Sequence, residues 1–180
     1  MDTLIVKYKV IPQNYEIIEI LSENFAIIYA DISIVENDEN IIQYEIPSKA
    51  YPMLAESKER SCITIGGNNV GGLSGKGVII GIIDSGITYN HNEFGSRIIY
   101  IWDIPSNKVY TQDEINQGID FQDINGHGTA VAGIAAGNSG VAYGADIIAV
   151  AIGRGSSDDI MQGIKFIEDK SREINKPFVI

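Results

Sequence analysis

The chain has 180 residues, 44% hydrophobic and 21% charged, with a formal net charge of −11 at pH 7. This is a globular composition, and its acidity argues against binding nucleic acid or an anionic membrane, since both need a basic face. The longest apolar run, Val78–Ile83, is far shorter than the roughly 20 residues that a membrane span requires. No secretory signal is recognisable at the N-terminus, so we expect an intracellular protein. The single cysteine, Cys62, excludes an internal disulfide.

The first part of the chain is rich in β-branched and aromatic residues, in short segments that favour strands. A turn is predicted at Ser22–Asn24 and a short helix within Ser33–Asn40. The pattern predicts a small antiparallel sheet with one or two helices on one face, that is, an α+β unit over residues 1–60. The predicted strands are Leu4–Val10, Tyr15–Leu21, Phe25–Ile32 and Ile41–Ile46.

After a glycine-rich joint, residues 61–180 show an α/β pattern. The continuous apolar run of Gly77–Asp84 is typical of a strand buried on both faces of a parallel sheet. Further strands are predicted at Arg97–Asp103, at Ala145–Gly153 and from Phe178 onward. A helix of small residues should follow His127. A second helix should begin at Ser157 as N-cap, with an apolar stripe of Ile160, Ile164 and Ile167.

Asp84 ends the buried strand, at the sheet edge where open parallel sheets build their sites. Its carboxylate could serve chemistry there, or it could simply cap the turn that follows.

His127 lies between two glycines at the start of the small-residue helix. The positive end of a helix favours the neutral imidazole, whereas a carboxylate such as Asp84 favours the protonated one and fixes the tautomer. That balance suits a general base. The alternative for a single histidine is a structural role, bonded to backbone.

Two segments, "GVIIGIIDSGITYNHNEF" and "DINGHGTAVAGIAAGN", resemble the aspartate and histidine motifs of the subtilisin-like serine proteases. The resemblance covers about Leu73–Ile180 and implies an incomplete parallel-sheet subtilisin-like α/β domain preceded by a propeptide-like unit. It implies that Asp84 orients His127 and that His127 is the general base of an Asp-His-Ser triad. Other segments, such as "RIIYIWD" and "TQDEINQGI", resemble the germination-specific subtilases of endospore-forming bacteria. That narrower resemblance implies a location within the spore and a precursor of a cortex-lytic enzyme as substrate.

The chain departs from the family pattern in its serine. No serine lies in a Gly-Thr-Ser segment, and neither Ser85 nor Ser139 can take the nucleophile's place. Asn138 follows the histidine helix too closely to be the family's oxyanion-hole asparagine, and Ala130 replaces a histidine found in many members. We therefore expect a serine endopeptidase truncated before its nucleophile, inactive as it stands and inclined to self-associate. The alternative is a catalytically inactive regulatory or binding fragment that acts through protein partners.

Other ligand sites fit the sequence poorly. The glycine-rich joint lacks Ser or Thr after Lys76, which a phosphate-binding loop needs, and Ile80 occupies the third glycine position of a dinucleotide fingerprint. With only two histidines, no transition-metal site and no cofactor are predicted. Calcium is common in the subtilisin-like fold, and Glu93 lies where some members place a ligand, but one carboxylate does not define a site.

Overall fold

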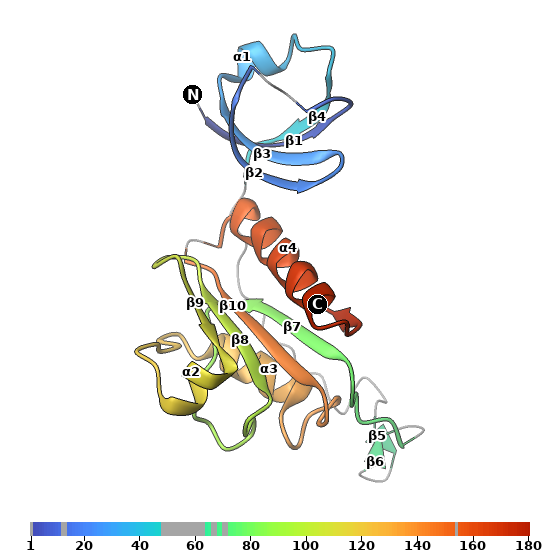
Figure 1. Ribbon diagram of the computed structural model, residues 1–180, viewed down its shortest axis with the longest axis vertical. Coiled ribbons are helices and arrows are strands. Elements are labelled where there is room, and N and C mark those ends of the chain that lie inside the picture. The colour runs from blue at the N-terminus through green and yellow to red at the C-terminus, as the bar shows by residue number, and fades with distance from the viewer. Residues whose placement is uncertain (1, 12–13, 48–63, 66–67, 70–71, 154) are drawn as a thin grey trace.

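The computed structural model describes residues 2–11, 14–47, 64–65, 68–69, 72–153 and 155–180. Its first part is a four-stranded antiparallel sheet, as the strand pattern predicts, and the strands lie in the order β2-β3-β1-β4 (Figure 1). The helix α1 (Ile32–Val35) follows β3, and its first turn is capped by the Asp31 carboxylate, which accepts from the Ser33 amide at 3.0 Å. The strands are β1 (Asp2–Tyr8), β2 (Glu16–Ser22), β3 (Phe25–Ala30) and β4 (Ile41–Glu45).

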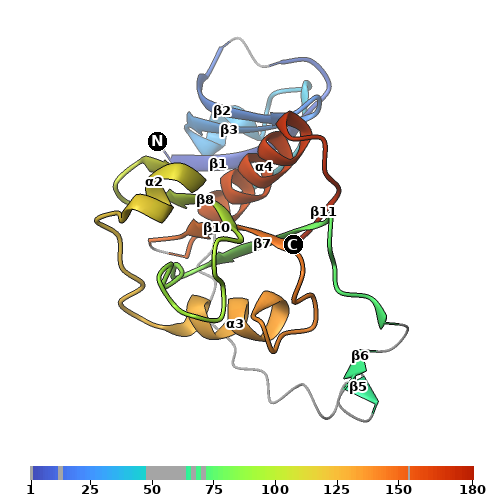
Figure 2. The same cartoon turned by 60° about the horizontal axis from the view of Figure 1, so that its bottom comes forward.

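Side chains alternate between the two faces of this sheet, as strand geometry requires. One face buries Leu4, Val6 and Tyr8 in a core of its own that α1 completes through Val35. The other face buries a second set, Ile5, Leu21 and Ile27, against which Met161 from the helix α4 (Ser157–Glu173) packs. The N-terminal sheet therefore rests on α4, as Figure 2 shows.

The second part is a five-stranded sheet in the order β11-β7-β10-β8-β9. The first four strands run parallel, as expected, but β9 pairs antiparallel with β8. The sequence patterns did not predict β9, because it is a short, largely exposed edge strand that returns directly from β8. The bounds are β7 (Ile79–Asp84), β8 (Ile98–Asp103), β9 (Lys108–Thr111), β10 (Asp146–Ala151) and β11 (Phe178–Val179). A separate short hairpin joins β5 (Thr64–Ile65) and β6 (Asn68–Asn69).

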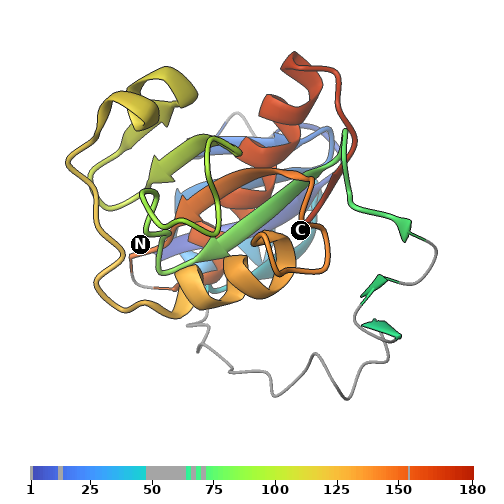
Figure 3. The same ribbon diagram turned by 90° about the horizontal axis from the view of Figure 1, so that it is seen from below.

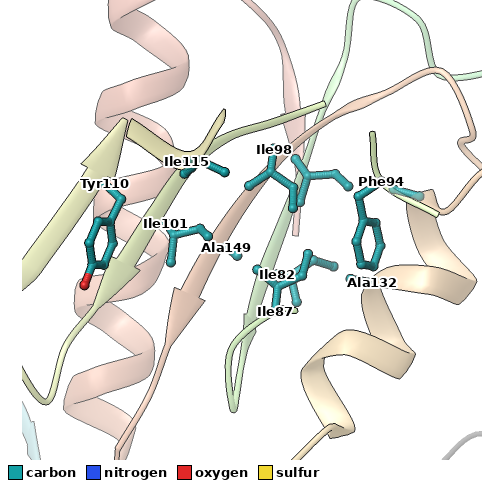
Figure 4. Packing of buried hydrophobic residues seen from close by; sticks show 11 residues of the cluster. Ile82, Ile87, Phe94, Ile98, Ile101, Tyr110, Ile115, Ala132 and Ala149 are labelled. Carbon is teal, nitrogen blue, oxygen red and sulfur yellow. The ribbon is translucent and has the colours of Figure 1, made fainter. Parts of the chain in front are cut away.

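The helices α3 (His127–Ala136) and α4 cover opposite faces of the five-stranded sheet (Figure 3). On the α4 side, Ile167 meets Ile79, Ile148 and Val150. On the α3 side, the small residues Ala132 and Ala136 are completely buried, and this core continues to α2 (Gln112–Gln117) beside β8 and β9. Figure 4 shows its members Ile82, Ile87, Phe94, Ile98, Ile101, Tyr110, Ile115, Ala132 and Ala149.

Two details of α4 correct the sequence prediction. The N-cap is Ser156 rather than Ser157, which is already the first helical residue. The predicted apolar stripe is only partly buried: Ile167 is inaccessible, whereas Ile164 is 36% exposed. The buried face instead carries Gly163, Ile167 and Ser171, because small residues let the helix lie close to β7, where a Cβ on Gly163 would contact Ile83 at 3.1 Å.

The predicted boundary between residues 60 and 61 lies outside the described residues. None of the helices in the described part of the chain is both long and apolar enough to cross a membrane.

Candidate active site

Asp84 and His127 lie together at the carboxyl edge of the five-stranded sheet. Asp84 is the last residue of β7, and His127 is the first residue of α3. The Nδ1 atom of His127 lies 2.8 Å from one carboxylate oxygen of Asp84 and 2.9 Å from the other. Both side chains are largely shielded from water, 9% exposed for His127 and 17% for Asp84. The structure thus brings the two predicted site residues into direct contact.

Asp84 also serves the turn that follows it, since its Oδ1 accepts a hydrogen bond from the Ser85 amide at 2.7 Å. Its turn-capping and histidine-binding roles are therefore combined in one side chain. With Nδ1 protonated and donating to Asp84, the basic lone pair of the imidazole lies on Nε2, the arrangement that a general base requires.

Helix α3 begins at His127 without a capping side chain of its own. Its N-cap is Gly126, which adopts a left-handed conformation with φ of 79° that glycine tolerates and most residues do not. The first-turn amides are satisfied by three side chains from outside the helix. Asn125 Oδ1 accepts from His127 N at 3.3 Å, Ser85 Oγ from Gly128 N at 3.0 Å, and Asp123 Oδ2 from Thr129 N at 3.0 Å.

The start of α3 lies unusually close to the turn after β7. A Cβ atom on Gly128 would lie 2.1 Å from the carbonyl oxygen of Gly86 and 3.1 Å from the Cβ of Asp84. Only glycine fits at this position. The close approach is what lets the histidine at the start of the helix reach the aspartate at the end of the strand.

Asp123 is a site residue that the sequence patterns did not single out. It is 6% exposed, and it accepts hydrogen bonds from Ser85 Oγ at 2.8 Å, Gly126 N at 3.0 Å, Thr129 N at 3.0 Å and Thr129 Oγ1 at 2.5 Å. Burial by itself raises the pKa of this carboxyl, but the hydrogen bonds outweigh it and hold the pKa below its ordinary value. An aspartate in a turn just before a helix was the available sequence signal.

The other residues weighed from the sequence lie outside the Asp84–His127 contact. The Ser85 hydroxyl is engaged with Asp123 and Gly128. Asn138 follows the C-terminal end of α3, the end opposite His127, where its side chain donates to Asn92 O at 3.0 Å. Glu93 accepts from the Ser139 amide at 3.0 Å.

Among the described residues, the pair belongs neither to a cluster of metal-binding side chains nor to the lining of the cavity between the two sheets. In the ranges that the structure describes, no three His, Cys, Asp or Glu side chains gather in a way that could hold a metal ion. A cavity of about 600 Å³ lies between the two sheets, and neither Asp84 nor His127 lines it. We place the candidate site at the pair, because an imidazole hydrogen-bonded to a carboxylate can transfer protons. The cavity is lined by Asp2, Thr3, Ile46, Pro47, Ile104, Pro105, Gly153, Ser156, Asp158 and Asp159.

Comparison with known proteins extends the likeness beyond these motifs. Residues 75–176 match the model of the subtilase family, Peptidase_S8. Cerevisin from Saccharomyces cerevisiae is 31% identical over 84% of this chain and 23% of its own length. The structure of the Clostridium perfringens CspB protease matches with a TM-score of 0.54 and 39% identity, over 59% of this chain and 28% of that one.

Fervidolysin from Fervidobacterium pennivorans shows a likeness of fold alone. It has 17% identity and a TM-score of 0.59, over 94% of this chain and 34% of fervidolysin. The chain therefore spans roughly a quarter to a third of the length of these relatives. With more than half of its residues matched by the family model and the aspartate and histidine motifs in contact, the chain belongs to the subtilase family.

Proposed function

We propose that Asp84 and His127 form the acid–base part of a serine endopeptidase whose nucleophilic serine comes from polypeptide outside these 180 residues. The observation that carries the proposal is the pair of Nδ1-to-carboxylate distances, 2.8 and 2.9 Å, in a chain of the subtilase family. The names of its relatives support the reaction class, since cerevisin matches alongside proteins named as serine proteases.

The pair would act by proton transfer. Asp84 holds the imidazole in the tautomer with the proton on Nδ1, so that Nε2 accepts the proton of a serine hydroxyl as the serine attacks the peptide carbonyl. The carboxylate then stabilises the imidazolium, which returns its proton to the leaving amine. As a lone chain, the protein should show no triad-dependent turnover, because base and orienting group have no nucleophile to activate.

The N-terminal sheet is proposed to act as a propeptide-like unit. Its support is the contact between one face of that sheet and α4, where Ile5, Leu21 and Ile27 are buried with Met161. Through this contact the N-terminal sheet lies against α4, on the face of the five-stranded sheet opposite to α3 and its histidine.

Within the family, we propose a germination-specific subtilase that acts inside the spore on a precursor of a cortex-lytic enzyme. The 39% identity with the Clostridium perfringens CspB protease supports a clostridial type of subtilase.

A chimera tests the reaction class. This chain would be joined to the part of the Clostridium perfringens CspB protease that lies beyond the region it matches. Turnover of a peptide substrate is expected, falling by about 10⁴-fold or more in the His127→Ala and Asp84→Asn variants. The His91→Ala variant is the matched control, because His91 lies on an exposed turn. Turnover that survives His127→Ala, or that the unmodified chain shows alone and loses on His127→Ala, would contradict the proposal.

One observation favours the alternative of a binding or regulatory protein. The strand β11 forms an edge of the sheet, where Val179 within it and Ile180 after it are 58% and 52% exposed. An exposed apolar edge strand is a template for pairing with another chain. Sedimentation of the purified chain at several concentrations would test it: self-association that disappears on Val179→Lys supports edge pairing, and a monodisperse monomer argues against it.

A further inference from the structure

We propose that Asp123 is a positioning residue that sets the contact between Asp84 and His127. The geometry of the proposal stands without the proposed function, and only its catalytic significance rests on that function. The hydrogen bonds of Asp123 go to Ser85, Gly126 and Thr129, which flank the two members of the pair. Asp123 acts on both members through the segments that carry them.

The buried carboxylate connects the turn after Asp84 with the start of α3. On one side it accepts from the hydroxyl of Ser85, whose own amide is bonded to Asp84 at 2.7 Å. On the other side it accepts from Gly126 and from both the amide and hydroxyl of Thr129, on either side of His127. A shift of this carboxylate would therefore move the two partners relative to each other.

Ser85 closes the network a second time, because its Oγ also accepts from Gly128 N at 3.0 Å. Thr129 extends it to the next turn, since its Oγ1 accepts from the Thr88 amide at 2.9 Å. The turn and the helix are thus tied at several points within a few residues of the pair. Capping the helix would need only one of these hydrogen bonds. The additional bonds hold the turn and the start of the helix at a fixed separation, and with them the side chains of Asp84 and His127.

An amide cannot replace the carboxylate here. Four donors from Ser85, Gly126 and Thr129 point at the two oxygens of Asp123. In Asp123→Asn, one of the two acceptors becomes an NH₂ donor, so at least one of those donors loses its partner. The substitution also removes a negative charge from the hydrogen-bonded network on either side of His127.

The test uses the complete chain and its two histidines, His91 and His127, which can be followed in one ¹⁵N-histidine NMR spectrum. In the parent, the Nδ1 proton of His127 should give a downfield resonance typical of a bond to carboxylate. In Asp123→Asn, this resonance should move upfield or disappear, and the pH at which His127 is half protonated should fall by at least about half a unit. Asp120→Asn is the matched control, because Asp120 is exposed and carries the same charge three residues away.

The His91 titration should stay unchanged in both variants, as a check that the fold is intact. The proposal would be wrong if Asp123→Asn and Asp120→Asn gave the same Nδ1 proton resonance of His127 and the same pH of half protonation. Should Asp123→Asn fail to fold, the pair Ser85→Ala and Ser85→Thr decides the matter. The alanine should weaken the downfield resonance and the threonine, which keeps the hydroxyl, should restore it; a parent-like spectrum for Ser85→Ala overturns the proposal.

Asp84→Asn separates this inference from the proposed function. If Asp84→Asn removes the downfield resonance and Asp123→Asn does not, only the positioning role fails. If Asp84→Asn leaves the resonance unchanged, the Asp84–His127 pair itself is wrong, and both proposals fall.

Discussion

At its N-terminal end, helix α3 is held by side chains that accept hydrogen bonds, whereas at its C-terminal end it is held by a side chain that donates them. The first-turn amides bond to Asn125, Ser85 and the carboxylate of Asp123. The last carbonyl, of Ala136, accepts from the Arg97 guanidinium at 2.5 Å, and Arg97 also bonds to Glu93 O at 2.7 Å and Ala145 O at 3.1 Å. The negative and positive charges match the two ends of the helix dipole.

The two ends of α3 therefore have different roles: one attaches the helix to the sheet, and the other positions His127 against Asp84. The C-terminal end is tied to the start of β8, where it holds the helix on the sheet. The N-terminal end is tied to the turn after β7, where the same bonds also set the Asp84–His127 contact. Both flanking residues, Gly126 and Gly137, lack side chains, so each end depends on partners from other segments.

Gly128→Ala should have the largest effect, since it forces the N-terminal end away from the β7 turn. The new methyl would lie 2.1 Å from Gly86 O, so we expect a loss of about 3 kcal/mol or more in the free energy of unfolding. Urea denaturation measures it. Gly133→Ala is the control in the same helix: its Cβ would meet nothing within 4 Å, and it should be neutral or stabilising by up to about 1 kcal/mol. Equal losses in both variants would contradict the close approach.

Arg97→Met should break the C-terminal end with a smaller loss, of about 2 kcal/mol, because buried carbonyls lose their donor. The Nδ1 resonance of His127 should persist, since the C-terminal end of α3 serves only to hold the helix on the sheet. Arg172→Met is the control, because the Arg172 side chain is 75% exposed and forms a surface ion pair with Glu168; it should cost less than about 0.5 kcal/mol. A loss of the His127 signal in Arg97→Met would show that the two ends are not independent.

The contribution of the Asp123 charge should depend on pH. Because its folded pKa lies below the ordinary value of 3.8, the ionised carboxyl stabilises the fold above that value, and this stability is lost as the pH falls through the folded pKa. The difference in unfolding free energy between the parent and Asp123→Asn should therefore be constant from pH 7 to about pH 5 and shrink below about pH 4. Urea titrations at four pH values measure it, and a difference unchanged at pH 3 would refute this account.

A small effect is expected for an ion pair that lies at neither end of α3. Lys176 and Asp146 form an ion pair at 2.5 Å, but the two side chains are 40% and 23% exposed. Lys176→Met should change the unfolding free energy by at most about 1 kcal/mol, and less at high salt, since exposed pairs are screened. A loss comparable to that of Arg97→Met would mean that charge, rather than the burial of carbonyls, decides the comparison.

Much of the fold could be predicted because it depends on local pattern. The apolar run ending at Asp84 predicted a strand buried on both faces, and the run of small residues after His127 predicted a helix. The strand β9 was not predicted, because it is an exposed edge strand that forms by pairing with β8. The N-cap of α4 was placed one residue too late, because Ser156 and Ser157 are adjacent and both suit that position.

Of the site, the sequence by itself determined the two chemical groups, Asp84 and His127, and their places at the end of a strand and the start of a helix. Only the tertiary structure decided how they meet. Asp123, Ser85 and Arg97 act on α3 from separate segments, and their roles depend on contacts between residues up to 48 positions apart in the chain. Strand and helix patterns are periodic and local, whereas a buried carboxylate finds its donors only when the sheet and the helix have packed together.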